Sequence, residues 1–386
     1  MRLTALLPVA AAVVLAAPAP AGAAEVEVIA DELDNPRHVA LAPDGDIYVA
    51  ESGVGGDPDT SRSCFDSAEG PSCTGATGAV TRIARHHHGY RQHRVISGLA
   101  SFAPEDQSNA IGPHGVFVDG HRLLVTNGGP TAPTRGDPPV LVLRDPTLVS
   151  EEPVSRLYGT LLEFSKWGGA RLVADIWRFE RRFNPDAEVG NPMIDSNPVD
   201  VYSAHGRTVV ADAGGNTVLR VGRHGRVRLL ALFPNVTVPD PFGGDPIDMN
   251  AVPTGVVGGP DGAYYVSQLT GFPFPVGGAN VFRVDPSTGA YTTYASGFTN
   301  AMDLAFGHDG TLYVLEIRRD SLLSENREGA ILAVPPGGGT PQEIDLPGET
   351  LIEPGGIAVG RHGDLYVSNH AREARLGEVL KIELDD

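Results

Sequence analysis

The sequence predicts an all-β protein, folded as a six-bladed β-propeller in which an amino-terminal strand completes the carboxy-terminal blade. One observation is a sequence motif of two short apolar strands around a tight turn, which occurs in six copies along the chain. A second is the composition, with 48 Gly and 32 Pro among 386 residues. Both residues interrupt helices, so this composition disfavours an all-helical fold.

The first copy of the motif spans residues 35–51 and the last spans residues 353–369. The turn between the two strands often contains Asp-Gly, a strong hairpin signal because Gly adopts positive φ without steric cost. A repeat of about 40–50 residues with four strands is typical of a propeller blade. The first strands of the six copies contain, in order, Val39, Val116, Val201, Val256, Leu304 and Ile357.

A third strand is expected after each hairpin, such as residues 79–83 in the first copy. A fourth is expected in five copies, such as residues 94–96, but the chain ends before the sixth copy can supply one. Residues 25–29 alternate as a strand does and would fill that position, leaving no free edge. The alternative is a frayed amino-terminal tail. A short helix is expected within residues 172–183, before Asn184-Pro185.

Residues 1–23 have the features of a signal peptide, with a basic start, an apolar run and a small-x-small cleavage pattern ending at Ala23. The apolar run of about 15 residues is shorter than a membrane span, which disfavours the alternative of a transmembrane anchor. We therefore expect a secreted, extracellular protein with one propeller domain over residues 24–386. Insertions are expected at residues 52–78 and 128–158. Cys64 and Cys73 lie in the first and should form a disulfide after export.

The formal net charge is −19, from 29 Lys and Arg against 48 Asp and Glu. Nucleic acid and anionic membranes would repel such a chain, so neither is expected as the main partner. We expect a monomer whose partner is a small polar ligand, a glycan or a protein.

In a four-stranded blade, the loops entering the first strand and those leaving the second strand lie at the same end of the propeller. Functional residues tend to occupy such loops on a rigid scaffold. Each second strand ends in a carboxylate or amide side chain: Glu51, Asn127, Asp212, Gln268, Glu316 and Asn369. Their oxygens suit Ca²⁺ or another divalent cation, and Glu51, Asn127, Asp212 and Asn369 are the candidate ligands. Alternatively, these side chains cap turns by bonding nearby backbone.

The turns entering the first strands add further polar residues to this face: Arg37, His38, His114, Asp195, Asn197, Thr254, Asn300, Asp303 and Glu353. We expect the ligand-binding face to include His38, His114, Gln268, Asn300 and Glu316. His38 and His114 could also be exposed and idle, as isolated histidines in turns usually are. Residues 267–276 place two Phe and two Pro on a loop, either as the floor of an apolar pocket or as a plug of the channel mouth.

Several longer motifs are distributed over nearly the whole chain after residue 23. They are Asn-Pro-Arg-His-Val at 35–39, Gly-Pro-His-Gly-Val at 112–116, Asp-Ser-Asn-Pro at 195–198, Val-Ala-Asp-Ala-Gly-Gly-Asn at 210–216, Val-Pro-Thr-Gly-Val at 252–256, Ser-Gln-Leu-Thr-Gly-Phe-Pro-Phe-Pro-Val at 267–276 and Gly-Phe-Thr-Asn at 297–300. Together these motifs resemble the ScyD/ScyE family. The resemblance implies an exported six-bladed, TolB-like propeller with NHL-like repeats, and it supplies no catalytic residues.

Three functions stay open at this point. The first is a secreted binding or scaffold protein, favoured because the chain has no nucleophile elbow, zinc-protease helix or Cys-x-x-Cys pair. The second is a metal-dependent hydrolase of the lactonase or gluconolactonase kind, with one divalent cation at the propeller axis. A quinone-dependent sugar dehydrogenase is a weaker third, because no set of basic residues for the quinone carboxylates is evident. Whether the protein is an enzyme is left undecided.

Overall fold

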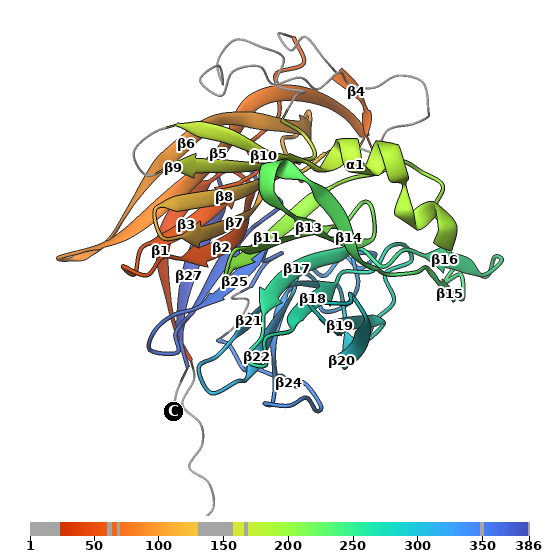
Figure 1. The fold of residues 1–386 in the computed structure, drawn as a ribbon. Helices are drawn as coiled ribbons and strands as arrows, with labels where there is room; N and C mark the ends of the chain where they lie inside the picture. The colour runs from red at the N-terminus through yellow and green to blue at the C-terminus, as the bar shows by residue number, and fades with distance from the viewer. Residues whose placement is uncertain are drawn as a thin grey trace, which may run out of the picture.

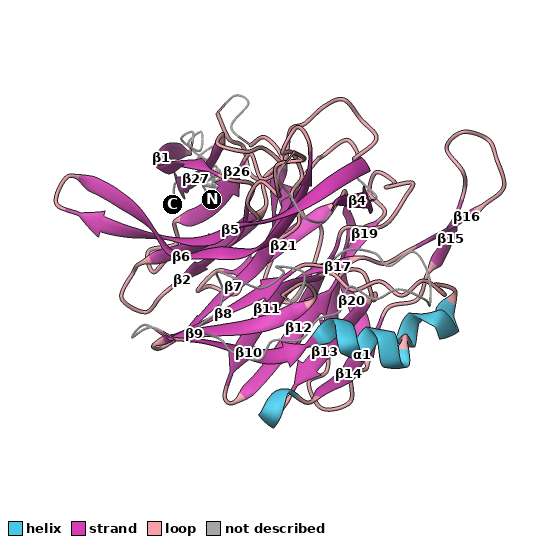
Figure 2. Cartoon of the chain, turned by 90° about the horizontal axis from the view of Figure 1, so that it is seen from above, coloured by secondary structure: helices cyan, strands magenta, loops and turns pink. Residues whose placement is uncertain are grey.

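A computed structural model describes residues 24–59, 64–67, 70–129, 157–165, 169–347 and 351–384. The strands form six antiparallel blades around one axis, which confirms the predicted six-bladed propeller (Figure 1 and Figure 2). The predicted signal peptide and residues 130–156 of the second predicted insertion lie outside the described residues.

Each blade runs from an innermost strand at the axis to an outer strand at the rim. Blade 1 contains β2 (Pro36–Leu41), β3 (Ile47–Glu51), β5 (Gly70–His86) and β6 (Gly89–Pro104), with β4 (Cys64–Ser67) paired to the start of β5. Blade 2 contains β7 (Pro113–Asp119), β8 (Arg122–Asn127), β9 (Thr160–Ser165) and β10 (Ala170–Asp175). Blade 3 contains β11 (Pro198–Ala204), β12 (Arg207–Asp212), β13 (Thr217–Val221) and β14 (Val227–Leu232).

The remaining three blades repeat this order. Blade 4 contains β17 (Pro253–Gly258), β18 (Tyr264–Gln268), β19 (Ala279–Val284) and β20 (Tyr291–Phe298). Blade 5 contains β21 (Ala301–Phe306), β22 (Leu312–Glu316), β23 (Ala330–Val334) and β24 (Gln342–Glu343). Blade 6 contains β25 (Gly356–Val359), β26 (Leu365–Asn369), β27 (Gly377–Glu383) and β1 (Glu25–Leu33).

The ring closes through β1, as the sequence predicts. β1 pairs antiparallel with β27, and its registered pairs include Val26 with Ile382 and Val28 with Leu380. The side chains of Ile29 and Leu33 are buried, so this strand contributes to the core as well as to hydrogen bonding. On the inside, each of β2, β7, β11, β17, β21 and β25 contacts the innermost strands of both neighbouring blades.

The hydrophobic core lies between adjacent blades. Val209 and Val218 of blade 3, for example, pack with Tyr264 and Val266 of blade 4. Asp-Gly turns set the hairpins: Asp309 Oδ1 accepts the Thr311 N–H at 2.9 Å, and Gly310 adopts φ +89°. This geometry is the reason that the turn requires Gly.

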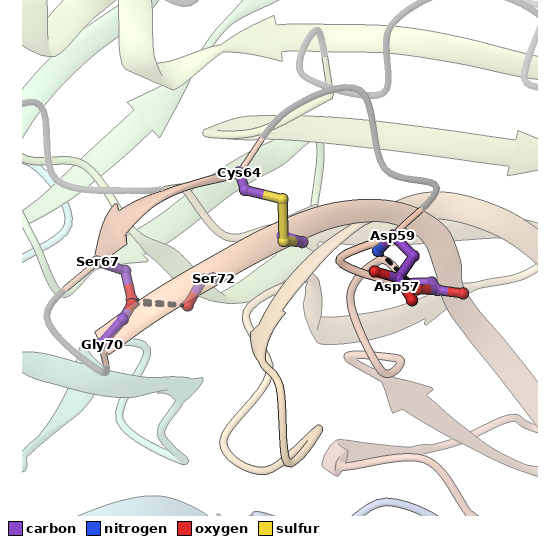
Figure 3. Close-up of a disulfide and its surroundings, with 7 residues drawn as sticks. Asp57, Asp59, Cys64, Ser67, Gly70 and Ser72 are labelled. Atoms are coloured by element: carbon purple, nitrogen blue, oxygen red, sulfur yellow. Dashed lines mark hydrogen bonds between the residues drawn. A yellow bond between two sulfur atoms is a disulfide. The ribbon is translucent and has the colours of Figure 1, made fainter.

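The first predicted insertion is more ordered than a loop. Part of it folds into β4 and the beginning of β5, which form a hairpin that holds Cys64 opposite Cys73. The two cysteines form the predicted disulfide, and Ser67 and Ser72 hydrogen-bond nearby (Figure 3). The sequence predicts a third strand at residues 79–83 and a fourth at residues 94–96. The observed strands β5 and β6 are much longer, because they extend along this hairpin.

The connections between blades contain further elements, including a 3-10 helix at Pro185–Val189. The predicted short helix is α1 (Ile176–Phe183), which begins where Asp175 Oδ1 accepts the Arg178 N–H at 2.7 Å. A hairpin of β15 (Val236–Val238) and β16 (Ile247–Met249), not predicted from the sequence, connects blade 3 to blade 4. In the part of the chain that the structure describes, no helix has the length and apolarity to cross a membrane.

Candidate functional site

A pocket lies on the propeller axis, where the innermost strands begin. The second residue of five of these strands lines it, namely Arg37, His114, Val199, Thr254 and Met302. Loops complete the wall, and the pocket volume is about 360 Å³. This is within the range of about 300–1,000 Å³ for small-molecule sites.

Much of the pocket wall is apolar. Val199 and Met302 come from strands, whereas Leu269 and Phe274 come from the loop after β18. That loop belongs to residues 267–276, so the structure favours the predicted pocket floor over a plug. Phe272 of the same loop is partly exposed and its ring stacks on the exposed Phe242, with centroids 6.4 Å apart.

Two arginines supply positive charge at the pocket. Arg37 is buried, and its guanidinium donates to Ser52 Oγ at 3.1 Å and to the Ala110 carbonyl at 2.6 Å. Arg372 donates to Asn109 Oδ1 at 3.1 Å and to Glu353 Oε1 at 3.2 Å. Both guanidinium groups are therefore held in place by neighbouring groups.

His114 contributes a neutral imidazole to the pocket. Its side chain is 3% exposed, and neither ring nitrogen has a hydrogen-bond partner. Burial lowers the pKa of His114 well below the ordinary value, and the charges of Arg37 and His38 lower it further. The ring can therefore accept one hydrogen bond and donate another to a ligand near neutral pH.

A second group of polar side chains lies one residue further along the innermost strands. His38, Asp200 and Asp303 come from blades 1, 3 and 5, and their ligand-type atoms lie within 4.8 Å of one another. The matching positions in blades 2, 4 and 6 are Gly115, Gly255 and Gly356. A Cβ on Gly115 would lie 2.6 Å from Asp200 Cα, and one on Gly356 would lie 2.5 Å from His38 Cα. The alternation of large and absent side chains lets the blades approach closely at the axis.

The two carboxylates in this axial cluster link neighbouring blades. Asp200 accepts the N–H of Val256 in blade 4 at 2.7 Å, and Asp303 accepts the N–H of Ile357 in blade 6 at 2.8 Å. Burial raises the pKa of Asp200 to about 7, although the neighbouring His38 opposes this change. Burial likewise raises the pKa of Asp303 to about 7.

His38 lacks comparable hydrogen bonds. Neither ring nitrogen makes a hydrogen bond of good geometry, and Nε2 lies 3.6 Å from Asp303 Oδ1. Burial lowers the pKa of His38, and nearby Asp200 opposes that effect. A separation of 3.6 Å is too long for a hydrogen bond but is close to the ligand–ligand spacing around a cation with bonds of about 2.1 Å. One nitrogen and two carboxylates fit Zn²⁺ or Mn²⁺ better than Ca²⁺, which prefers oxygen ligands.

The structure gives the four predicted metal ligands other partners. Glu51 accepts hydrogen bonds from Arg94, Thr81 and the Asp34 N–H. Asp212 accepts from Ser196 and from the N–H groups of Asn197 and Gly215. Asn369 accepts the Ile352 N–H and donates to Glu378, whereas Asn127 donates weakly to the carbonyl of Ala100. Glu51, Asp212 and Asn369 thus each cap the turn that enters the first strand of their own blade.

The five residues predicted for the ligand face are divided among several environments. His114 lines the pocket, and His38 belongs to the axial cluster. Gln268 accepts hydrogen bonds from Asn280, and Asn300 bonds Leu269 and Leu322. Glu316 accepts the Thr299 N–H at 2.6 Å, and burial raises its pKa to about 8.

Sequence reasoning overlooked Asp200 and Arg372. Aligning the six repeats with one another would have identified Asp200, because Asp200 lies two residues after Pro198, just as His38 lies two residues after Pro36. Arg372 follows no repeat pattern, and only the folded contacts place it at the pocket.

The fold and the site define a six-bladed propeller with a small-molecule-sized pocket at its axis. The sequence matches no known protein-family profile, so the resemblance to the ScyD/ScyE family stays a prediction. No curated protein matches the sequence either.

Solved structures with a similar fold include a protein of unknown function from Bacteroides thetaiotaomicron, at 11% identity and TM-score 0.51, covering 94% of this chain and 76% of that one. A gluconolactonase from Xanthomonas campestris is 13% identical with TM-score 0.48, covering 94% and 90%. A virginiamycin B lyase from Staphylococcus aureus is 12% identical with TM-score 0.45, covering 94% and 99%. At these identities the likeness concerns the fold alone.

Proposed function

We propose that this chain is an exported, ScyD/ScyE-like binding protein that holds a small molecule in the axial pocket. The observation that carries the proposal is the convergence of Arg37, Arg372 and the neutral His114 on a pocket whose remaining wall is largely apolar. A few fixed polar groups in an apolar concavity are typical of small-molecule sites. The disulfide and the signal-like residues 1–23 support the exported location.

The pocket chemistry selects the class of ligand. Guanidinium groups favour carboxylates and other anionic or strongly accepting groups. The apolar side chains of Val199, Met302 and Phe274 favour a compact hydrocarbon or aromatic body. The expected ligand is therefore a small ring-bearing acid or carbonyl compound. A protein or long glycan would use the surrounding loops and would not need the pocket.

Replacing His114 by Leu is expected to weaken ligand binding by about tenfold or more while changing stability little. The ring nitrogens make no hydrogen bond in the protein, so the substitution leaves no buried group newly unpaired. A panel of small aromatic and alicyclic acids, each paired with its amide, would be screened by thermal shift and the hits measured by calorimetry. His86→Leu, at the exposed tip of a hairpin, is the control. A ligand that binds both variants equally well would place binding elsewhere.

A second function, a metal-dependent hydrolase of the lactonase or gluconolactonase kind, rests on the axial cluster. His38, Asp200 and Asp303 would hold one divalent cation, adjacent in sequence to residues that line the pocket. A bound cation would polarise the carbonyl group of a substrate and would lower the pKa of a bound water molecule. In the pocket, Arg37 would orient the substrate and the neutral His114 would accept a proton.

Metal analysis of the purified protein is expected to find about one Zn²⁺ or Mn²⁺ per chain if this second function holds. Added cation should then raise the melting temperature by mass action. His38→Leu should abolish both effects, because it removes the nitrogen ligand, and it breaks no hydrogen bond of good geometry. Asp212→Asn, a buried substitution outside the cluster, should preserve them. The hydrolase function would be excluded if the protein contained no cation and added cation did not raise the melting temperature, or if the protein hydrolysed none of a panel of lactones. The binding function would then be the one that remains.

A further inference from the structure

A strongly basic surface lies at the end of the propeller opposite the axial pocket. The pocket is at the start of β11, and the antiparallel register of blade 3 places the turn between β13 and β14 at the other end of the sheet. This turn and the two strands, β13 and β14 (labelled in Figure 1), carry Arg220, Arg223, Arg226 and Arg228. The last three are exposed.

These arginines line a connected pair of hollows. One, of about 520 Å³, is lined by Arg220, Gly222, Arg223, His224, Arg226 and Arg228. The other, of about 390 Å³, shares Gly222, Arg223 and His224 and extends to Arg122 and Arg171 of blade 2. Glu163 is the one acidic side chain in either lining, and it pairs with Arg122 and Arg171. We call this surface the arginine groove.

Blade 3 differs from blades 1 and 4 in that the arginine on its third strand has no acidic partner in the described part of the chain. In blade 1, Arg82 on the third strand pairs with Asp46 of the first hairpin turn at 2.6 Å. In blade 4, Arg283 pairs with Asp261 in the same way at 2.6 Å. Arg220 occupies the equivalent position in blade 3. The hairpin turn there is Ala-His-Gly-Arg at 204–207 and contains no acid.

Without that carboxylate, the positive charges of blade 3 face one another. Arg220 bonds the Pro286 carbonyl instead, and it stands directly opposite Arg228 in the β13–β14 register. Like charges directly opposite on paired strands are destabilising. Within the described residues, Arg223, Arg226 and Arg228 form no ion pair. A protein of net charge −19 therefore maintains a local cationic surface at some cost in stability.

We infer that the arginine groove binds an acidic polysaccharide, a linear glycan that bears carboxylate groups. Planar guanidinium groups bind carboxylates with two parallel hydrogen bonds. The second hollow also presents Ser203, Thr208 and the glycine backbones of Gly206 and Gly225, which suit sugar hydroxyls. The two adjoining hollows give the groove the extended shape that a chain of sugars requires.

Other polyanions fit less well. Binding of single-stranded nucleic acid relies largely on Phe, Tyr and Trp side chains that stack with bases, and neither hollow is lined by any of these three. The overall negative charge would also repel a polymer of high charge density. Double-stranded nucleic acid, with two phosphates per base pair, has a higher charge density than a polyuronate with one carboxylate per sugar.

The test measures binding of a linear oligogalacturonate to the wild-type protein and to the triple variant Arg223→Gln, Arg226→Gln, Arg228→Gln. We expect binding that weakens with added salt and falls at least tenfold in the triple variant. The matched control, Arg82→Gln, Arg283→Gln, Arg319→Gln, removes the same charge from arginines that pair with acids, and its affinity should stay within about twofold. His114→Leu should also bind the glycan normally, which separates this site from the axial pocket.

Three results would overturn the inference. One is no binding of the oligogalacturonate at low salt. Another is an equal loss of affinity in the control variant, which would reduce the effect to net charge. The third is binding of a neutral dextran or a single-stranded oligonucleotide as tightly as the oligogalacturonate. Melting temperatures of both triple variants would establish that they fold, as expected for exposed side chains.

Discussion

Replacing Glu180 by Gln is expected to stabilise the protein by about 2–4 kcal/mol at pH 8 and to have little effect at pH 5. Glu180 lies on α1 and is 1% exposed, and its Oε1 has no hydrogen-bond partner. Burial raises the pKa of Glu180 to about 9, and the negative charges of Asp212, Asp186 and Asp195 add to the effect.

The direction of the pH dependence follows from the position of this proton. In the unfolded chain Glu180 has its ordinary pKa of 4.5, whereas in the folded protein its pKa is about 9. Between these values the folded state binds the proton that the unfolded state has released. The free energy of unfolding therefore falls as the pH rises through this interval. Gln has the same shape and carries no titrating proton, so it removes this dependence.

Denaturant unfolding at several pH values would measure the effect. The wild-type protein should lose stability from pH 5 to pH 8, and Glu180→Gln should show a flatter curve. Exposed Glu188→Gln, from the segment after the same helix, is the control and should follow the wild type. Parallel curves for wild type and Glu180→Gln would mean that Glu180 is ionised in the folded protein.

Replacing Glu353 by Ala is expected to cost about 3–5 kcal/mol, because it leaves arginines without their shared carboxylate. Glu353 is buried and accepts hydrogen bonds from Arg318 and Arg327, each at 2.6 Å, and from Arg372 at 3.2 Å. Burial alone would raise the pKa of Glu353, but the bond from Arg327 and the charges of Arg372 and Arg318 lower it. The stability that it provides is therefore present near neutral pH and is lost only as the pH falls below about 4.5.

Because Arg372 lines the pocket, Glu353→Ala should also weaken ligand binding. The comparison variant is Glu343→Ala, which removes a partly exposed partner of Arg319 and should cost less than about 1 kcal/mol. Denaturant unfolding would measure the loss of unfolding free energy in each variant. An equal loss in the two variants would show that the arginines around Glu353 are adequately solvated without it.

The repeats made the fold predictable from the sequence. Alternating apolar strands and Asp-Gly turns specify each hairpin locally, and the missing fourth strand of the last copy identifies residues 25–29 as its replacement. The length of β5 and β6 was not predictable, because their pairing depends on how the disulfide hairpin folds back on blade 1.

The site was harder to predict because it depends on which hydrogen bonds the side chains make. Glu51 and Asp212 have ligand-type oxygens, but their own turns offer N–H groups that engage them first. At the axis, Asp200 and Asp303 likewise accept hydrogen bonds from the backbone, whereas the ring of His38 makes no hydrogen bond of good geometry. A buried histidine that makes no hydrogen bond of good geometry can be recognised only once the burial and neighbours of each atom are known.

The pairing of β1 with β27 has a consequence for biosynthesis. Among the strands described here, β1 is synthesised first and its partner β27 is synthesised last, so the sixth sheet cannot form until both have been made. Until then the nascent polypeptide lacks its closing contact. Closure of the ring is therefore expected to be the last step in the folding of the propeller.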